Sequence, residues 1–132
     1  MVNSKKKGAV GEREVAALLR SYGFEGAKRG VQHAGRDKFG NDFPDVVCPE
    51  LEWLHIEVKR TERFSSVVKA FEQVEGDKQA HQKGVIFWRG NGHEWAISMK
   101  ADEFLELIRL IHGNSLGKES ELKECIDMSE VL

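Results

Sequence analysis

The chain has 132 residues, of which 40% are hydrophobic and 32% charged. This composition is typical of one soluble globular domain and excludes a disordered chain. No apolar run approaches the roughly 20 residues that cross a bilayer, and no apolar segment of a secretory signal follows the basic amino terminus. The two cysteines, Cys48 and Cys125, lie too far apart to suggest a disulfide framework or a zinc site. We therefore expect a cytoplasmic protein that does not enter a membrane.

Positive charge is concentrated in the first third of the chain. Residues 1–41 hold nine lysines and arginines against four acidic residues, a balance of +5, and because the net charge is −2 the remainder carries −7. A basic front end is compatible with binding a polyanion through one face. An ordinary solvated surface explains the same charges equally well.

The first half of the chain predicts one helix and three strands. Apolar residues recur at helical spacing over 9–22, with Val15, Leu19 and Tyr22 on one side, and Gly23 follows as a stop. Residues 31–43 are rich in chain breakers and polar side chains, as in a loop. Three strands are expected, near residues 25–30, over 44–48 and over 53–59, the last two joined by a tight turn.

The second half predicts a helix, a strand pair and a final helix. The first helix, 65–80, carries an apolar stripe that is expected to be buried: Phe64, Val67, Val68, Phe71 and Val74. A glycine-rich turn at 90–92 joins strands over 84–89 and 93–98. The last helix, 101–112, has one apolar face: Ala101, Phe104, Leu105, Ile108 and Ile111.

The order of these elements predicts the fold class. It reads α-β-β-β-α-β-β-α, which is typical of an α/β protein with a mixed sheet flanked by helices. We expect one domain over residues 1–112, followed by a polar, acidic tail over 113–132.

The strand over 53–59 has an unusual polar face. Side chains alternate along a strand, so His55, Glu57 and Lys59 point to one side and the apolar residues point to the other. At a rise of roughly 3.3 Å per residue, Glu57 and Lys59 lie within about 7 Å of each other. A solvent-facing edge with an incidental ion pair would explain this pattern as well.

Asp45 stands at the start of an apolar strand, where aspartate is uncommon. An aspartate that begins a turn is one explanation. The tight connection to the next strand, however, can bring Asp45 close to Glu57. Two carboxylates at short distance repel each other, and a divalent cation relieves that repulsion.

Glu12 is a third acid in an unexpected place. At about 100° per residue, Glu12 lies on the apolar side of its helix with Val15 and Leu19, whereas Glu14 points toward water. An acid in the first turn can simply stabilise the helix dipole. Otherwise Glu12 points at the sheet, toward something positive.

These segments resemble the PD-(D/E)XK nuclease superfamily, and within it the Holliday-junction-resolvase-like branch. The chain is also similar to small nucleases encoded by phages and prophages, and the resemblance covers roughly residues 5–110. It implies a restriction-endonuclease-like αβββαβ core. It rests on Lys7-Gly8-Ala9-Val10-Gly11-Glu12-Arg13-Glu14-Val15, Phe43-Pro44-Asp45-Val46-Val47 and His55-Ile56-Glu57-Val58-Lys59-Arg60.

The resemblance also implies roles for the acids and the lysine. Asp45 and Glu57 would coordinate Mg²⁺ or Mn²⁺, helped by the backbone carbonyl of Val58, and Glu12 would complete the site from the helix. Lys59 would orient the attacking water and offset charge in the transition state. A carboxylate-held metal supplies both a nucleophile and charge shielding, which phosphodiester cleavage needs.

Basic and amide side chains around this site are candidate DNA contacts, because phosphate binding dominates affinity for DNA. Solvated surface charges are the alternative. His55 and Gln73 are further candidates near the substrate, although Gln73 is also expected as a plain surface residue. The candidate DNA contacts are Lys7, Arg13, Arg29, Gln32, Arg36, Lys38 and Arg60.

The sequence therefore predicts a Mg²⁺-dependent DNA endonuclease that is structure-selective and acts as a homodimer on four-way or branched DNA. One alternative is a nicking, restriction-like or genome-processing nuclease on duplex DNA. Another is a non-catalytic DNA-binding module of the same fold. The long segment 31–43 and the acidic tail depart from the resolvase pattern, so the preferred DNA structure stays open.

Overall fold

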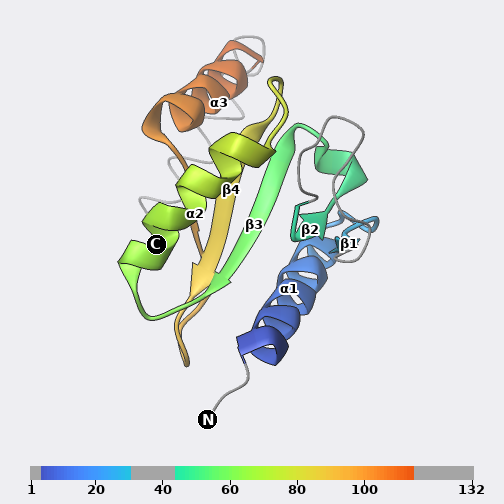
Figure 1. The fold of residues 1–132 in the computed structure, drawn as a ribbon. Coiled ribbons are helices and arrows are strands. Elements are labelled where there is room, and N and C mark those ends of the chain that lie inside the picture. The colour runs from blue at the N-terminus through green and yellow to red at the C-terminus, as the bar shows by residue number, and fades with distance from the viewer. Residues whose placement is uncertain (1–3, 31–43, 115–132) are drawn as a thin grey trace, which may run out of the picture. The chain divides into compact units, whose positions relative to one another are not determined.

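The computed structural model describes residues 4–30 and 44–114, and the chain divides into two units, residues 1–99 and 100–132 (Figure 1). The first unit holds two helices and a five-stranded sheet, and the second begins with one helix. The elements are α1 (Ser4–Ser21), β1 (Lys28–Arg29), β2 (Val46–Val47), a short 3-10 helix η1 (Pro49–Leu51), β3 (Leu54–Arg60), α2 (Phe64–Asp77), β4 (Lys83–Arg89), β5 (Ala96–Ser98) and α3 (Ala101–Asn114). The predicted order of elements is confirmed.

The sheet is mixed, as predicted, and its strands follow chain order from β1 to β5. β3 and β4 are parallel and every other neighbouring pair is antiparallel. The parallel pair is connected through α2, as a crossover between parallel strands requires. β3 is therefore the middle strand, with β2 on one side and β4 on the other.

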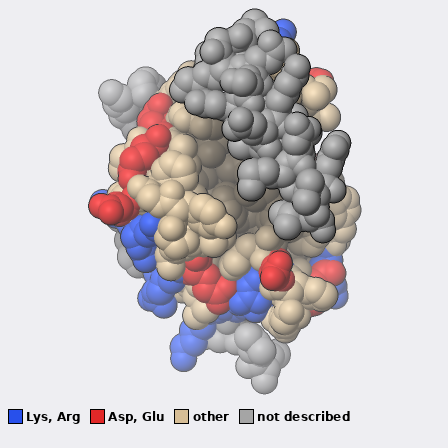
Figure 2. Space-filling view, turned by 180° about the vertical axis from the view of Figure 1, so that it is seen from behind, with Lys and Arg blue, Asp and Glu red and all other residues tan. Residues whose placement is uncertain are grey.

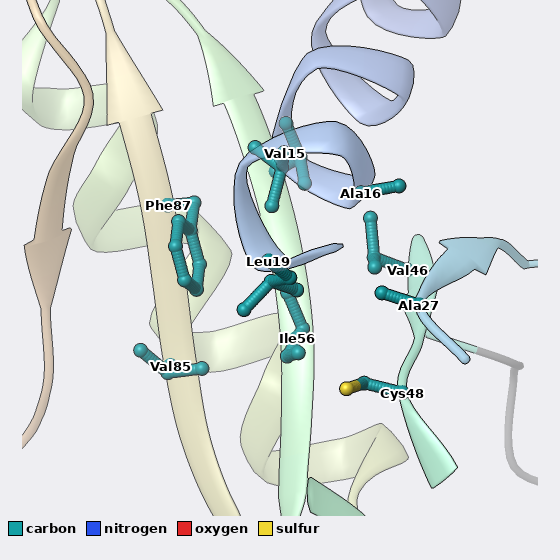
Figure 3. Packing of buried hydrophobic residues seen from close by; sticks show 10 residues of the cluster. Val15, Ala16, Leu19, Ala27, Val46, Cys48, Ile56, Val85 and Phe87 are labelled. Carbon is teal, nitrogen blue, oxygen red and sulfur yellow. The ribbon is translucent and has the colours of Figure 1, made fainter. Parts of the chain in front are cut away.

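α1 covers one face of this sheet and forms the larger core (Figure 3). Val15, Ala16 and Leu19 point from the helix toward Ile56 of β3 and Phe87 of β4. The remaining buried members of this cluster are Ala27, Val46, Cys48, Val58 and Val85. The predicted apolar side of the first helix is confirmed at Val15 and Leu19.

The first helix differs from the prediction at both ends. α1 is already formed at Ser4, five residues before the predicted start, because lysines are good helix formers but add nothing to an apolar pattern. It ends at Ser21, so Tyr22 lies beyond the helix and is 77% exposed rather than buried. Gly23 has a φ of 97°, which only glycine adopts easily, and it terminates the helix as predicted.

α2 covers the opposite face and forms a second, smaller core. Val67, Ala70 and Val74 are buried against Ile86 of β4. The predicted stripe was wrong at Phe64 and Val68, which are exposed because the buried line runs through Ala70 instead. Phe64, in the first turn, packs edge-on against Trp88 with ring centroids 6.1 Å apart. Phe71 is half-buried beside this core.

The middle strand β3 is buried on both faces. Four consecutive residues, 55–58, are buried, because α1 packs on the side of Ile56 and Val58 while α2 packs on the side of His55 and Glu57. Strands with helices on both faces lose the alternation of buried and exposed residues. The solvent-facing edge that the sequence left open for this strand is therefore excluded.

An ion pair between Glu14 and Arg89 joins α1 to the end of β4. Arg89 donates from Nη2 to Glu14 Oε1 at 2.9 Å and from Nε to Glu14 Oε2 at 3.0 Å. Trp95 donates from its indole nitrogen to the same carboxylate at 3.1 Å, and the guanidinium of Arg89 lies 5.3 Å from the centre of the Trp95 ring. The expectation that Glu14 points into water was wrong, since its partners come from the other end of the chain.

The second unit begins with α3, which confirms the predicted last helix. Its apolar side chains Phe104, Leu105, Ile108 and Ile111 are exposed. The predicted tail over 113–132 lies mostly outside the described residues, so the predicted division after residue 112 stays a prediction. No helix within the described ranges is long and apolar enough to span a membrane.

We expect the Glu14→Ala variant to lose about 2 kcal/mol of unfolding free energy, because the partly buried guanidinium of Arg89 loses its bidentate partner. Urea unfolding followed by circular dichroism measures this loss. Glu52→Ala is the matched control, because it breaks an exposed ion pair with His81 and should change stability by about 1 kcal/mol or less. Equal losses in the two variants would show that the Glu14 bonds do not hold α1 to the sheet.

Candidate active site

Two carboxyl groups meet where β2 and β3 pair. The register places Val46 beside Ile56, and Asp45 donates its backbone N–H to the Ile56 carbonyl at 3.1 Å. This brings the Asp45 side chain against Glu57, with which it is hydrogen-bonded. Asp45 Oδ2 also accepts the backbone N–H of Val58 at 2.9 Å.

A close approach of β1 holds Asp45 from its other side. Gly30 donates its backbone N–H to the Asp45 carbonyl at 2.8 Å. A side chain at Gly30 would collide with the carbonyl oxygen of Pro44, so only glycine lets the two segments come this close. The backbone at Asp45 is thus fixed by bonds to residues 30 and 56.

The two carboxyl groups hold protons more readily than free side chains do. Burial, together with the hydrogen bond and charge of Glu57, raises the pKa of Asp45 from 3.8 to about 7. Burial also raises the pKa of Glu57, which is only 3% exposed. The pair is therefore poorly stable as two free anions and needs either a proton or a cation between its oxygens.

Glu12 reaches the same place from α1. It is buried, and its Oε2 accepts a hydrogen bond from Arg29 Nε at 2.8 Å. Burial raises its pKa, the Arg29 bond opposes this, and the negative charge of Asp45 raises it further. The charge of Glu12 in turn raises the pKa of Glu57. The three acids that the sequence singled out are thus close enough to influence one another's ionisation.

Lys59 and Val58 follow Glu57 along β3. Alternation puts Lys59 on the face of Glu57, and its positive charge lowers the pKa of both Glu57 and Asp45. The Val58 side chain is buried in the larger core, while its backbone N–H donates a hydrogen bond to Asp45 Oδ2. The predicted role of the Val58 carbonyl as a metal ligand stays a prediction.

His55 is buried beside Glu57 rather than open to a substrate. Its imidazole is 2% exposed, and Nε2 lies 2.9 Å from Glu57 Oε1. Burial lowers its pKa, against the charges of Asp77 and Asp45, which raise it. The sequence offered His55 as a group near the substrate, but its burial leaves no direct contact available.

Asp77 is a neighbour that sequence reasoning missed. It ends α2, and its charge raises the pKa of both His55 and Glu57. Its Oδ2 atom is buried without a hydrogen-bond partner. A signal was present in the sequence, because Asp77 continues the helical spacing of the buried residues Ala70 and Val74.

The donor set suits a hard divalent cation. Within the described ranges, no group of three or more His, Cys, Asp or Glu is arranged to hold a metal ion as it stands. Asp45 is hydrogen-bonded to Glu57 instead, and Glu12 accepts a hydrogen bond from Arg29. Mg²⁺, however, is commonly held by one or two carboxylates and otherwise by water and phosphate oxygens. The Asp45–Glu57 pair meets that requirement.

A basic hollow lies at the end of the sheet where α1 begins. It has a volume of about 310 Å³ and is lined by Lys6, Lys7, Val10, Arg60 and Asn91. Arg60 donates from Nη2 to Asn91 Oδ1 at 2.8 Å, which holds the guanidinium in the wall of the hollow. In Figure 2, lysine and arginine side chains gather toward this lower end, with acidic side chains among them.

The other predicted DNA contacts are spread more widely. Arg13 is exposed on α1 next to Glu12, and Arg29 is engaged with Glu12. Gln73 is exposed on α2, which agrees with its expectation as a surface residue. Gln32, Arg36 and Lys38 lie outside the described residues.

Comparison with known proteins identifies the family. The model of the family described as archaeal Holliday junction resolvase (Hjc) matches residues 3–130. No curated protein and no solved structure matches the chain. The family match includes α1, the β2–β3 pair and every acid described above. The chain belongs to the archaeal Holliday junction resolvase family of the restriction-endonuclease-like PD-(D/E)XK superfamily, and it is a Holliday junction resolvase-like nuclease that hydrolyses DNA.

Proposed function

We propose that this nuclease depends on a divalent metal ion and cuts four-way or branched DNA with Asp45, Glu57, Lys59 and Glu12 as its active site. The observation that carries the proposal is the contact between the half-buried carboxyl group of Asp45 and the buried one of Glu57, whose pKa values are raised and which lie near Lys59 on β3. Strongly perturbed carboxyl groups beside a cation are typical of functional sites.

Asp45 and Glu57 would hold Mg²⁺ or Mn²⁺ in place of the hydrogen bond between them. Glu12 and the carbonyl of Val58 are the further ligands that we propose, with Glu12 exchanging its bond to Arg29. When bound, the ion lowers the pKa of water and shields the charge that develops on the phosphate. The charge of Glu57 raises the pKa of Asp45, that of Asp45 raises the pKa of Glu12, and that of Glu12 raises the pKa of Glu57, so a cation among the three acids relieves their repulsion.

Lys59 would act on the reacting phosphate. Its ammonium group can donate to the attacking water or to a phosphate oxygen, and it offsets negative charge as that charge develops. Its place on the face of Glu57 puts the cation and the carboxylate on the same side of β3. Lys59 is thus the residue whose loss should affect cleavage more than binding.

The surrounding cations would bind the DNA backbone. Lys7 and Arg60 line the basic hollow, where β3 ends three residues after Glu57, and Arg13 is exposed next to Glu12 in sequence. Arg29 would be freed for phosphate if Glu12 turned to the metal. Contacts of this kind set the affinity and orientation of DNA but carry no sequence information.

A four-way junction would be cut by a homodimer. Two symmetric cuts need two active sites, and the proposed active site supplies one per chain. The dimer is therefore an expectation that follows from the substrate. Sedimentation of the protein with junction DNA tests it, and a complex that contains one chain would contradict it.

We expect Lys59→Ala to bind junction DNA normally but to cleave it roughly 100- to 1000-fold more slowly, because a donor to the transition state is lost. Gel-shift binding in EDTA and a single-turnover cleavage assay in Mg²⁺ measure the two effects. Lys69→Ala removes an exposed lysine from α2 and should cleave like the wild type. An equal loss of binding and cleavage in Lys59→Ala would contradict the proposed role.

We expect the free energy of unfolding in EDTA to fall as the pH rises between about 4 and about 7. Asp45 is protonated in the folded protein up to about pH 7 but ionises near 3.8 when unfolded, so its stabilising contribution is lost over this range. Asn at position 45 is neutral throughout. Urea unfolding at several pH values should therefore give a smaller decline for Asp45→Asn than for the wild type.

Glu94→Gln, at an exposed residue, is the control for this pH series and should retain the wild-type decline. If the free energy of unfolding of Asp45→Asn falls with pH as steeply as that of the wild type, the proton that stabilises the folded protein is not on Asp45.

We expect a synthetic four-way junction to be cleaved faster than a linear duplex of the same arm sequence, and EDTA to abolish both reactions. A gel with both substrates and with Glu57→Gln measures this. Equal rates would favour a nuclease of ordinary duplex DNA. Binding without any Mg²⁺-stimulated cleavage would favour a DNA-binding module.

A further inference from the structure

The environment of His55 differs from that of an ordinary surface histidine. His55 is 2% exposed and sits between β3 and α2, with Nε2 2.9 Å from Glu57 Oε1. His81 also contacts a carboxylate, Glu52, at 2.6 Å, but these two side chains are 51% and 63% exposed. A buried bond of this kind orders both side chains, whereas an exposed one exchanges with water.

The bond to Glu57 has one direction when Glu57 is ionised, as a metal ligand is. An ionised carboxylate has only acceptors, so the imidazole then donates its N–H from Nε2. Glu57 then receives a hydrogen bond at Oε1 from its own strand, in addition to its bond with Asp45 from β2. The carboxylate is restrained by two different elements before any ligand arrives.

The fold restricts the imidazole as well. Alternation along β3 puts His55 on the face covered by α2, and its pairing partner on β4 is Gly84, where a side chain would collide with Val74 of α2. Burial under the helix removes alternative rotamers and competing water. A donor held in this way can direct a carboxylate, whereas a flexible donor cannot.

We propose that His55 is a positioning residue, which donates from Nε2 to Glu57 Oε1 and so aims the remaining lone pairs of Glu57 at the metal ion. This inference rests on the proposed function, because it assumes that Glu57 is a metal ligand. His55 itself touches neither the metal nor the DNA. Outer groups that hydrogen-bond to metal ligands commonly change metal affinity or activity by 10- to 100-fold when removed.

Metal binding without DNA tests this inference separately from cleavage. Titration calorimetry of Mn²⁺ into the full chain should give a dissociation constant roughly 10- to 100-fold weaker for His55→Leu than for the wild type. His81→Leu is the matched control and should bind Mn²⁺ as the wild type does. The Mg²⁺ concentration for half-maximal cleavage should rise in parallel, while DNA binding in EDTA stays unchanged.

Two amide variants at position 55 keep the inference testable if His55→Leu does not fold. The amide nitrogen of glutamine reaches the position of Nε2, whereas that of asparagine reaches only the position of Nδ1. His55→Gln should therefore recover most of the Mn²⁺ affinity and His55→Asn should not. A purely structural role would not separate these two variants.

Mn²⁺ binding by variants of His55 and Glu57 tests the positioning role of His55 separately from the proposed metal site. If Glu57→Ala abolishes Mn²⁺ binding and His55→Leu binds like the wild type, the positioning role is overturned and the metal site stands. The positioning role is also overturned if the two amide variants bind Mn²⁺ equally. If Glu57→Ala binds Mn²⁺ normally, the proposed metal site is itself overturned.

Discussion

The buried contact between the carboxyl groups of Asp45 and Glu57 is the constraint on which the first unit depends. Two acids in a shielded place cannot both stay ionised unless a cation lies between them, and without one a carboxylate of the pair takes up a proton. The backbone of Asp45 is hydrogen-bonded on both sides, to Gly30 and to Ile56. The sheet thus holds two mutually repelling groups in place, which is costly for stability and useful for binding a cation.

α1 and α2 contribute different residues to the surroundings of Asp45 and Glu57. α1 builds the larger core with one side of the sheet and delivers Glu12, already paired with Arg29, to the edge of that core. α2 closes the other side, where it buries His55 and brings Asp77 near Glu57. Glu57 therefore lies under a helix on a strand that is covered on both faces, and this burial raises its pKa.

Glu14 holds α1 against the sheet. Glu14 occupies Arg89 through two parallel bonds and takes a third from Trp95, which joins the start of the chain to its last strands. Lys7 and Arg60 line a hollow at the same end of the sheet, and Arg60 Nη1 lies 3.9 Å from Glu14 Oε1. Residues two positions apart on α1 thus serve different purposes: Glu12 faces the acids and Glu14 holds the helix in place.

Local patterns in the sequence determined most of the elements and three acids of the candidate site. Helical and alternating periodicities are properties of neighbouring residues, so they survive in a single sequence. Asp45, Glu57 and Lys59 lie on strands joined by a short turn, and their approach follows from that connection. The helical face of Glu12 followed from the same kind of pattern.

Only the tertiary structure decided the surroundings of these acids. The burial of His55, the approach of Asp77 and the pairing of Glu14 with Arg89 all depend on residues 20 or more positions apart. Which side of a helix or strand is covered depends on what packs there from elsewhere in the chain. The alternation along β3 therefore predicted that His55, Glu57 and Lys59 share one face. It did not predict that α2 covers this face.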